Sequence, residues 1–199
     1  MRFKKGDLMF RPMIVAAALV LGFTAHADLT QVTPAASVIT TSLTLAAPAV
    51  RDIPLTVGDS CDYQLSGGMF QGTMHSFVRE STADGIWVEQ DFDLGMMGKQ
   101  KIEALYDKQT GKVLKLLANG QEQAIPDASK MKVVETRQES LTVPAGTFQS
   151  MYLKIHDSDK NTDTETWITK TVGVGGMIKT IAPSPLGNLT LELTAFVKK

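Results

Sequence analysis

Apolar and polar residues alternate one by one along most of the chain after residue 54, which is the pattern of half-buried β-strands. Between Ile86 and Leu94 the apolar side chains alternate with Trp87 and acidic residues, and between Leu189 and Ala195 they alternate with threonine and glutamate. The same periodicity predicts about nine strands, at residues 70–78, 86–94, 101–106, 112–118, 133–143, 151–156, 164–169, 176–181 and 189–195.

Short turn signals separate these strands, among them Asp84-Gly85, Asn119-Gly120 and Pro144-Ala145-Gly146. We therefore predict an all-β fold in which the strands form an antiparallel meander. No stretch carries a helical stripe, although residues 125–131 are suited to one short helical turn. Such a sheet buries one face by curling into a half barrel or barrel, whose interior is either filled with side chains or left open for an apolar ligand.

The first 27 residues have the three regions of a cleavable secretory signal. Lys4, Lys5 and Arg11 provide the basic region, an apolar run follows at residues 13–23, and residues 25–27 (AHA) fit cleavage after Ala27. Eleven apolar residues are too few for a membrane-spanning helix, which needs about 20. We expect a signal peptide at 1–27 and a single β domain at 54–199. The Thr/Ser/Ala-rich residues 28–53 are interpreted as a linker, with an irregular first strand near 37–45 as the alternative.

The charge and the cysteine content restrict the cellular compartment and the partners that we expect. The leader contains four of the 20 basic and one of the 21 acidic residues, which leaves 16 and 20 and a net charge of −4. This balance does not favour nucleic acid as a partner. Cys61 is the single cysteine, so an internal disulfide is excluded, and we expect a periplasmic protein with a buried structural thiol rather than a redox or bridging one.

Three sequence segments resemble the C-terminal half of uncharacterised exported bacterial proteins: residues 142–148 (TVPAGTF), 165–168 (ETWI) and 172–179 (VGVGGMIK). Residues 55–59 (LTVGD) with Tyr63 resemble their opening strand. These proteins are similar in outline to the periplasmic lipoprotein carriers of the Lol system, the LolA/LolB-like half barrels. The resemblance, which covers Pro54 to Phe196, implies an apolar concavity that shields lipid chains.

If the interior of the curled sheet is open, we expect apolar side chains that point inward from the strands to line it. This candidate ligand site comprises Met74, Phe92, Met151, Leu191 and Leu193. The many methionines suit an adaptable apolar pocket; the alternative, a copper(I) site, usually has tighter methionine clusters than Met96-Met97. The segment 94–98 around this pair could form an apolar lip at the mouth.

A second candidate site is the acidic stretch 157–165, in which oxygen-bearing side chains alternate as in a calcium loop. The candidate ligands are Asp157, Asp159, Asn161 and Asp163. The stretch lacks the glycine at the sixth place, where Thr162 stands, and the glutamate at the twelfth, where Ile168 stands. We favour a solvated polar loop.

Other chemical signals are weak, and we predict no enzyme and no cofactor. His75 and His156, the histidines outside the leader, have no catalytic or zinc spacing, although the two could meet in space. Glu89, Asp91 and Asp93 are expected to form a solvated stripe on the outer face. The glycines at 173, 175 and 176 precede a strand rather than a helix, which favours a bulge or bend over a phosphate-binding loop.

Two functions remain open on these grounds. The first is a periplasmic protein that binds or shields an apolar ligand or a lipid-modified partner. The second is a structural or interaction module of the cell envelope with a packed interior. A cavity lined by the candidate ligand residues would favour the first function.

Overall fold

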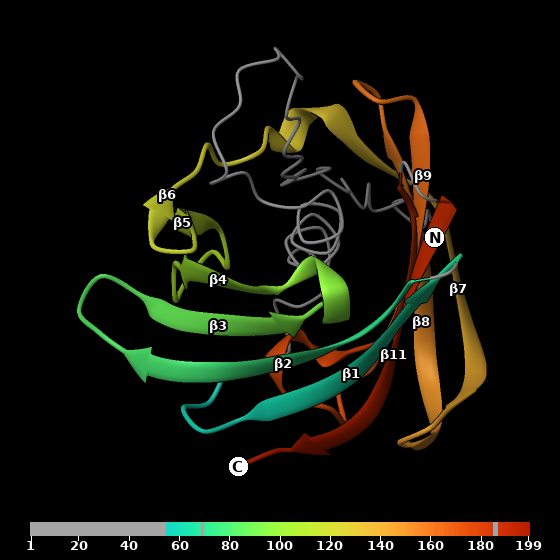
Figure 1. The fold of residues 1–199 in the computed structure, drawn as a ribbon, viewed down its shortest axis with the longest axis horizontal. Coiled ribbons are helices and arrows are strands. Elements are labelled where there is room, and N and C mark those ends of the chain that lie inside the picture. The colour runs from blue at the N-terminus through green and yellow to red at the C-terminus, as the bar shows by residue number, and fades with distance from the viewer. Residues whose placement is uncertain (1–54, 69, 185–186) are drawn as a thin grey trace, which may run out of the picture.

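The computed structural model describes residues 55–199 except 69 and 185–186, and it contains one curled antiparallel sheet without α-helix in these residues (Figure 1). The sheet has eleven strands in the described part of the chain, and three short 3-10 turns connect them. The strands are β1 (Ser60–Gly67), β2 (Phe70–Ser81), β3 (Ile86–Asp93), β4 (Lys99–Tyr106), β5 (Val113–Ala118), β6 (Gln121–Glu122), β7 (Met131–Val143), β8 (Gly146–Asp157), β9 (Thr162–Ile168), β10 (Met177–Ser184) and β11 (Gly187–Val197); the 3-10 turns are η1 (Gly95–Met97), η2 (Ala128–Lys130) and η3 (Val174–Gly176).

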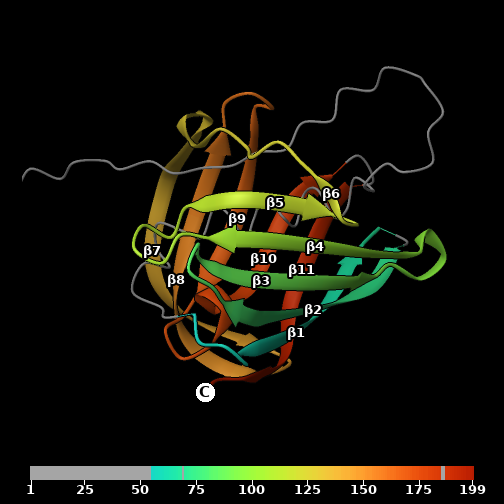
Figure 2. The same ribbon diagram turned by 90° about the vertical axis from the view of Figure 1, so that its left-hand side faces the viewer.

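The sheet is open, because its order is β6-β5-β4-β3-β2-β1-β11-β10-β9-β8-β7 and the edge strands β6 and β7 do not pair. The first and last strands, β1 and β11, pair in the middle and join two consecutive meanders. Residues 123–130, which we call the strap, connect the two free edges and cross from one arm of the curl to the other (Figures 1 and 2). The predicted meander is confirmed, and of the two shapes expected the sheet has the open, half-barrel one.

The nine predicted strands all form, at slightly different bounds. The two additional strands are β1, which was expected only as the opening strand of the resemblance, and the two-residue β6. The short helical turn expected near 125–131 is present as η2, which Asp127 caps by accepting the backbone N–H of Ser129. The predicted signal peptide and linker lie outside the described residues. None of the helices in the described part of the chain is long or apolar enough to cross a membrane.

Most of the apolar core lies on the concave face, where residues from strands that are not neighbours meet. Tyr63 on β1 donates its hydroxyl hydrogen to the carbonyl oxygen of Met177 on β10 at 2.9 Å, across the intervening β11. The backbone N–H of Ala145, in the turn between β7 and β8, donates to the carbonyl oxygen of Leu193 on β11 at 3.0 Å. These contacts hold the curl and bury one face of the sheet at its centre.

The glycine-rich segment before β10 forms a bend, as the sequence indicated. Gly175 and Gly176 have φ of 79° and 71°, a region that glycine enters without steric cost, and the ladder between β9 and β10 shifts register at Met177. The carbonyl oxygen of Gly173 accepts the thiol hydrogen of Cys61 at 3.5 Å. The segment therefore closes one end of the core.

Candidate ligand site on the concave face

Four of the five predicted ligand residues are buried in the core cluster. Met74, Phe92, Leu191 and Leu193 are each at most 2% exposed. Met74 pairs with Phe92 across β2 and β3, and the alternation of side chains places both on the concave face. The structure brings these four together as packing residues of one cluster; their part in binding stays a prediction.

Met151, the fifth predicted residue, is 39% exposed and lines a cavity of about 210 Å³. The register places Gln138 of β7, Met151 of β8 and Ile168 of β9 in one row. Met151 lies on the same face of β8 as Leu153, which pairs with Thr166 on β9. The hydroxyl groups of Thr166 and Thr180 are hydrogen-bonded, and Thr180 pairs with the core residue Leu191 on β11. Met151 therefore lies on the concave face. The described residues that line the cavity are Gln138, Gln149, Ser150, Met151, Ile168, Thr169 and Lys170.

Among the described residues that line this cavity, Met151 alone was a predicted site residue. Gln138 and Gln149 are polar side chains in strands and carry no motif, and Ile168 was assigned only to a strand. Their meeting depends on the pairing of three strands, and period-two alternation alone does not give the register between strands.

The acidic loop between β8 and β9 does not gather its carboxylates around one point. Asp157 accepts the backbone N–H groups of Asp159 (2.9 Å) and Lys160 (3.2 Å) in a local turn. Asp159 faces Lys130 at 3.4 Å, whereas Asp163 accepts from His156 at 2.8 Å. Asn161 has a φ of 52°, as in a tight turn. In the described part of the chain no three His, Cys, Asp or Glu side chains are close enough to hold a metal ion.

Cys61 and the two histidines occupy structural positions. Burial raises the pKa of the Cys61 thiol to about 12, so the thiol is protonated at neutral pH. This agrees with the predicted buried thiol. His75 on β2 contacts Asp62 at 2.6 Å and stacks near Phe77, while His156 lies on β8 in the other arm of the sheet.

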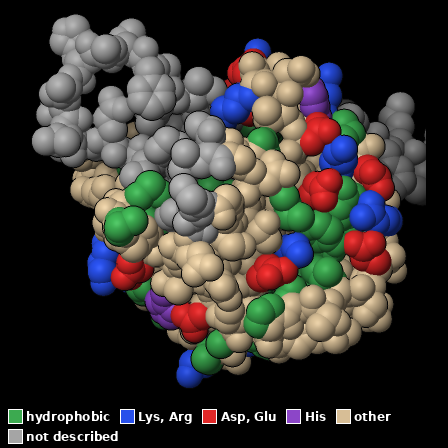
Figure 3. Space-filling model, turned by 45° about the vertical axis from the view of Figure 1, so that its right-hand side comes forward, with side chains coloured by type: hydrophobic (Ala, Val, Ile, Leu, Met, Phe, Trp, Pro, Cys, Tyr) green, Lys and Arg blue, Asp and Glu red, His purple; other side chains and the backbone are tan. Residues whose placement is uncertain are grey.

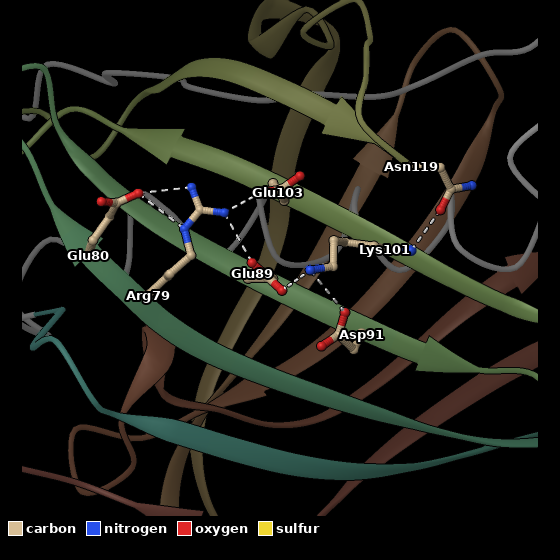
Figure 4. Close-up of polar contacts among 7 residues, drawn as sticks. All are labelled: Arg79, Glu80, Glu89, Asp91, Lys101, Glu103 and Asn119. Carbon is tan, nitrogen blue, oxygen red and sulfur yellow. Dashed lines mark hydrogen bonds and ion pairs between the residues drawn. The ribbon is translucent and has the colours of Figure 1, made fainter.

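A network of charged side chains covers the convex face of β2, β3 and β4 (Figure 4). Arg79 lies 3.1 Å from Glu89 and also contacts Glu103, and Lys101 donates a hydrogen bond to Glu89. Glu89 is only 5% exposed, which corrects the expectation of a solvated stripe at this position. Burial alone would raise the pKa of Glu89, but the hydrogen bonds and charges of Lys101 and Arg79 lower it below its ordinary value.

The other arm carries an aromatic pair on the face opposite Leu153. The rings of Tyr152 and Trp167 meet edge to face at 5.0 Å, and the guanidinium of Arg137 lies 3.4 Å from the centre of the Tyr152 ring. The indole N–H of Trp167 donates to the carboxylate of Glu139. Acidic and basic side chains are interspersed on the side of the molecule drawn in Figure 3. Tyr152 and Trp167 are buried and belong to the same core cluster as Leu191 and Leu193, so the apolar core extends to this face of β8 and β9.

No protein-family model matches the chain, and no curated protein matches its sequence. Two solved structures are similar in fold. The hypothetical protein CT021 from Chlamydia trachomatis is 12% identical, with a TM-score of 0.47, and the match covers 78% of this chain and 91% of that one. MucB is 11% identical, with a TM-score of 0.43, and the match covers 76% of this chain and 55% of MucB. At these values both likenesses are distant and assign no function, so the resemblance to lipoprotein carriers stays a prediction.

Proposed function

We propose that the protein is a periplasmic binding protein, without enzymatic activity, that shields an apolar ligand or a lipid-modified partner on its concave face. The observation that carries this proposal is the cavity of about 210 Å³ beside Met151 on the concave face of an open sheet. Met151 lies on β8, next to the free edge strand β7, so the cavity is close to the gap between the two edges.

The size and lining of the cavity suggest what part of a ligand it receives. Pockets for drug-sized ligands measure about 300–1,000 Å³, so a cavity of about 210 Å³ suits the end of one acyl chain rather than a whole lipid. The thioether of Met151 and the side chain of Ile168 supply apolar contact, and the thioether adapts to chains of different shape. Gln138 and Gln149 form the polar rim.

A second candidate function, a structural module of the envelope, is favoured by a different observation. Met74, Phe92, Leu191 and Leu193 are buried in one cluster, as expected of an interior filled by side chains. The binding function expects a ligand bound to the purified protein, and the structural function expects none.

Native mass spectrometry of the protein, purified without detergent from the periplasm of cells that express the full chain, tests the proposal. We expect an adduct of lipid mass on the wild-type protein. Met151→Trp should remove this adduct, because the larger side chain fills the cavity. Thr73→Trp, which places the same side chain on the exposed convex face of β2, is the matched control and should retain the adduct.

The thermal unfolding midpoints of both variants establish that they remain folded. A bare wild-type mass would contradict the binding proposal and favour the structural module. An adduct that persists in folded Met151→Trp would show that the ligand does not use this cavity.

A further inference from the structure

Among the described residues of β2 and β4, two buried side-chain oxygens on the concave face have no hydrogen-bond partner. They are Oγ of Ser76 on β2 and Oε1 of Gln100 on β4. Ser76 is 0% exposed and Gln100 is 7% exposed, so neither oxygen depends on bulk water as its partner. Most buried polar atoms in proteins are paired, and an unpaired one destabilises the folded state, which makes each of them a feature to be explained.

Both oxygens lie among the apolar side chains on the concave face of β2, β3 and β4, which we call the apolar wall. Gln100 pairs with Phe92 across β3 and β4, and Phe92 pairs with Met74 across β2 and β3. Ser76 is two residues beyond Met74 on β2, so the alternation of side chains puts it on the same face. The two polar groups therefore stand among side chains that would suit a hydrocarbon.

The chemistry of the two groups restricts what could pair with them. An amide oxygen only accepts hydrogen bonds, and a serine hydroxyl accepts and donates. A plain hydrocarbon offers neither function, and an ester offers acceptors alone. The oxygen of Gln100 is satisfied by a ligand that brings an N–H or O–H group into the apolar wall.

The apolar wall and Met151 are placed so that one ligand could contact both. β4 is the third strand from the free edge at β6, and β8 is the second strand from the free edge at β7. The strands β4 and β8 therefore lie on opposite arms of the curl, on either side of the gap between β6 and β7 (Figure 1).

We propose that the ligand has one hydrocarbon chain with a hydrogen-bond donor next to it, an amide N–H or a hydroxyl, and that the amide oxygen of Gln100 accepts this donor, with the Ser76 hydroxyl as a second polar contact for the ligand's polar end. The inference rests on the proposed binding function and specifies the ligand class. The hydrocarbon chain extends from the donor towards the cavity at Met151.

Three probes of equal chain length separate the donor from the chain: N-methyloctanamide and 1-octanol carry a donor, and methyl octanoate does not. Isothermal titration calorimetry on the protein, unfolded, freed of co-purified lipid and refolded, should show that the amide, the alcohol or both bind about tenfold more tightly than the ester, the factor expected for one added buried hydrogen bond. Comparing the amide with the alcohol identifies which donor the wall accepts.

Gln100→Met keeps the length of the side chain and removes the acceptor. We expect this variant to lose the preference for the donor probes, to bind the ester as the wild type does, and to unfold at a higher temperature without ligand, because a buried unpaired oxygen is gone. Ser76→Ala should reduce the preference as well. Gln64→Met, on the exposed convex face of β1, is the control and should change neither property.

The outcomes distinguish this inference from the function on which it rests. Equal affinities for all three probes, or an undiminished preference in Gln100→Met, would overturn the inference and leave the binding function standing. A lower unfolding temperature of Gln100→Met would also overturn it, because the oxygen would then have a partner within the protein. Binding of none of the probes by the wild-type protein would count against the proposed function itself.

Discussion

At the scale of single residues, Glu89 illustrates how the convex face is held together. Its carboxylate lies between Arg79 and Lys101, and both cations also reach other carboxylates. Removing the Glu89 carboxylate leaves the cations partly paired, so the loss should be smaller than for an isolated buried ion pair.

We predict that Glu89→Gln lowers the free energy of unfolding at pH 7 by about 1–2 kcal/mol, because a charged acceptor for two cations becomes neutral. The pKa of Glu89 is lowered in the folded state, so its stabilising contribution is complete above its ordinary value of 4.5 and is lost as the pH falls through the lowered pKa. Urea unfolding between pH 7 and pH 3, followed by tryptophan fluorescence, measures both effects. The variant should lose less stability in acid than the wild type; equal losses would contradict the prediction.

At the scale of elements, the turn between β2 and β3 shows why one glycine is needed. A Cβ atom on Gly85 would lie 2.4 Å from the carbonyl oxygen of Tyr106 and 2.8 Å from Cδ1 of Leu105. Both neighbours are at the end of β4, and a backbone oxygen has little freedom to move. The hairpin therefore packs against β4 only with glycine at this position.

Gly85→Ala should destabilise the protein by about 2 kcal/mol or more, because the added methyl group pushes β4 away from the turn. Thermal unfolding monitored by circular dichroism measures the shift of the midpoint. Asp84→Ala, at the exposed neighbouring position of the same turn, should leave the midpoint nearly unchanged. A midpoint of Gly85→Ala equal to that of the wild type would show that the close approach is relieved without cost.

The elements were largely predictable because each strand carries its own alternation. The strand β1 was the main omission, although Cys61, Tyr63 and Leu65 alternate with polar residues as clearly as in any other strand. Of the ligand residues predicted from the sequence, Met151 is the one that lines the cavity among the described residues. Ser76 and Gln100 resemble ordinary polar strand residues in sequence, and their burial arises only when the sheet curls and register places them beside Phe92 and Met74.

At the scale of the whole molecule, the two meanders are joined by the β1–β11 ladder at the centre and by the strap at the edges. The strap contributes no strand to the sheet. The ladder and the Tyr63–Met177 hydrogen bond lie at the centre of the sheet, away from the strap.

A cut in the strap should therefore leave the protein assembled. We expect that a protease site inserted between Ala124 and Ile125, both exposed, can be cleaved while the fragments continue to elute together in gel filtration and keep the β-sheet circular dichroism spectrum. The cost of the cut is the loss of chain connectivity, and the central ladder is unaffected. Separation of the fragments at micromolar concentration would show that the strap, rather than the ladder, holds the two halves.

The strap also acts as a tether of fixed length between the two free edges. Glu122 ends β6 and Met131 begins β7, and the nine Cα steps between them span at most about 30 Å when fully extended. Opening the sheet at this gap breaks none of its ladder hydrogen bonds, since β6 and β7 share none. The widest object that can enter the curl from this side is consequently limited by the number of residues in the strap. A longer or shorter strap would change that limit without changing any side chain of the concave face.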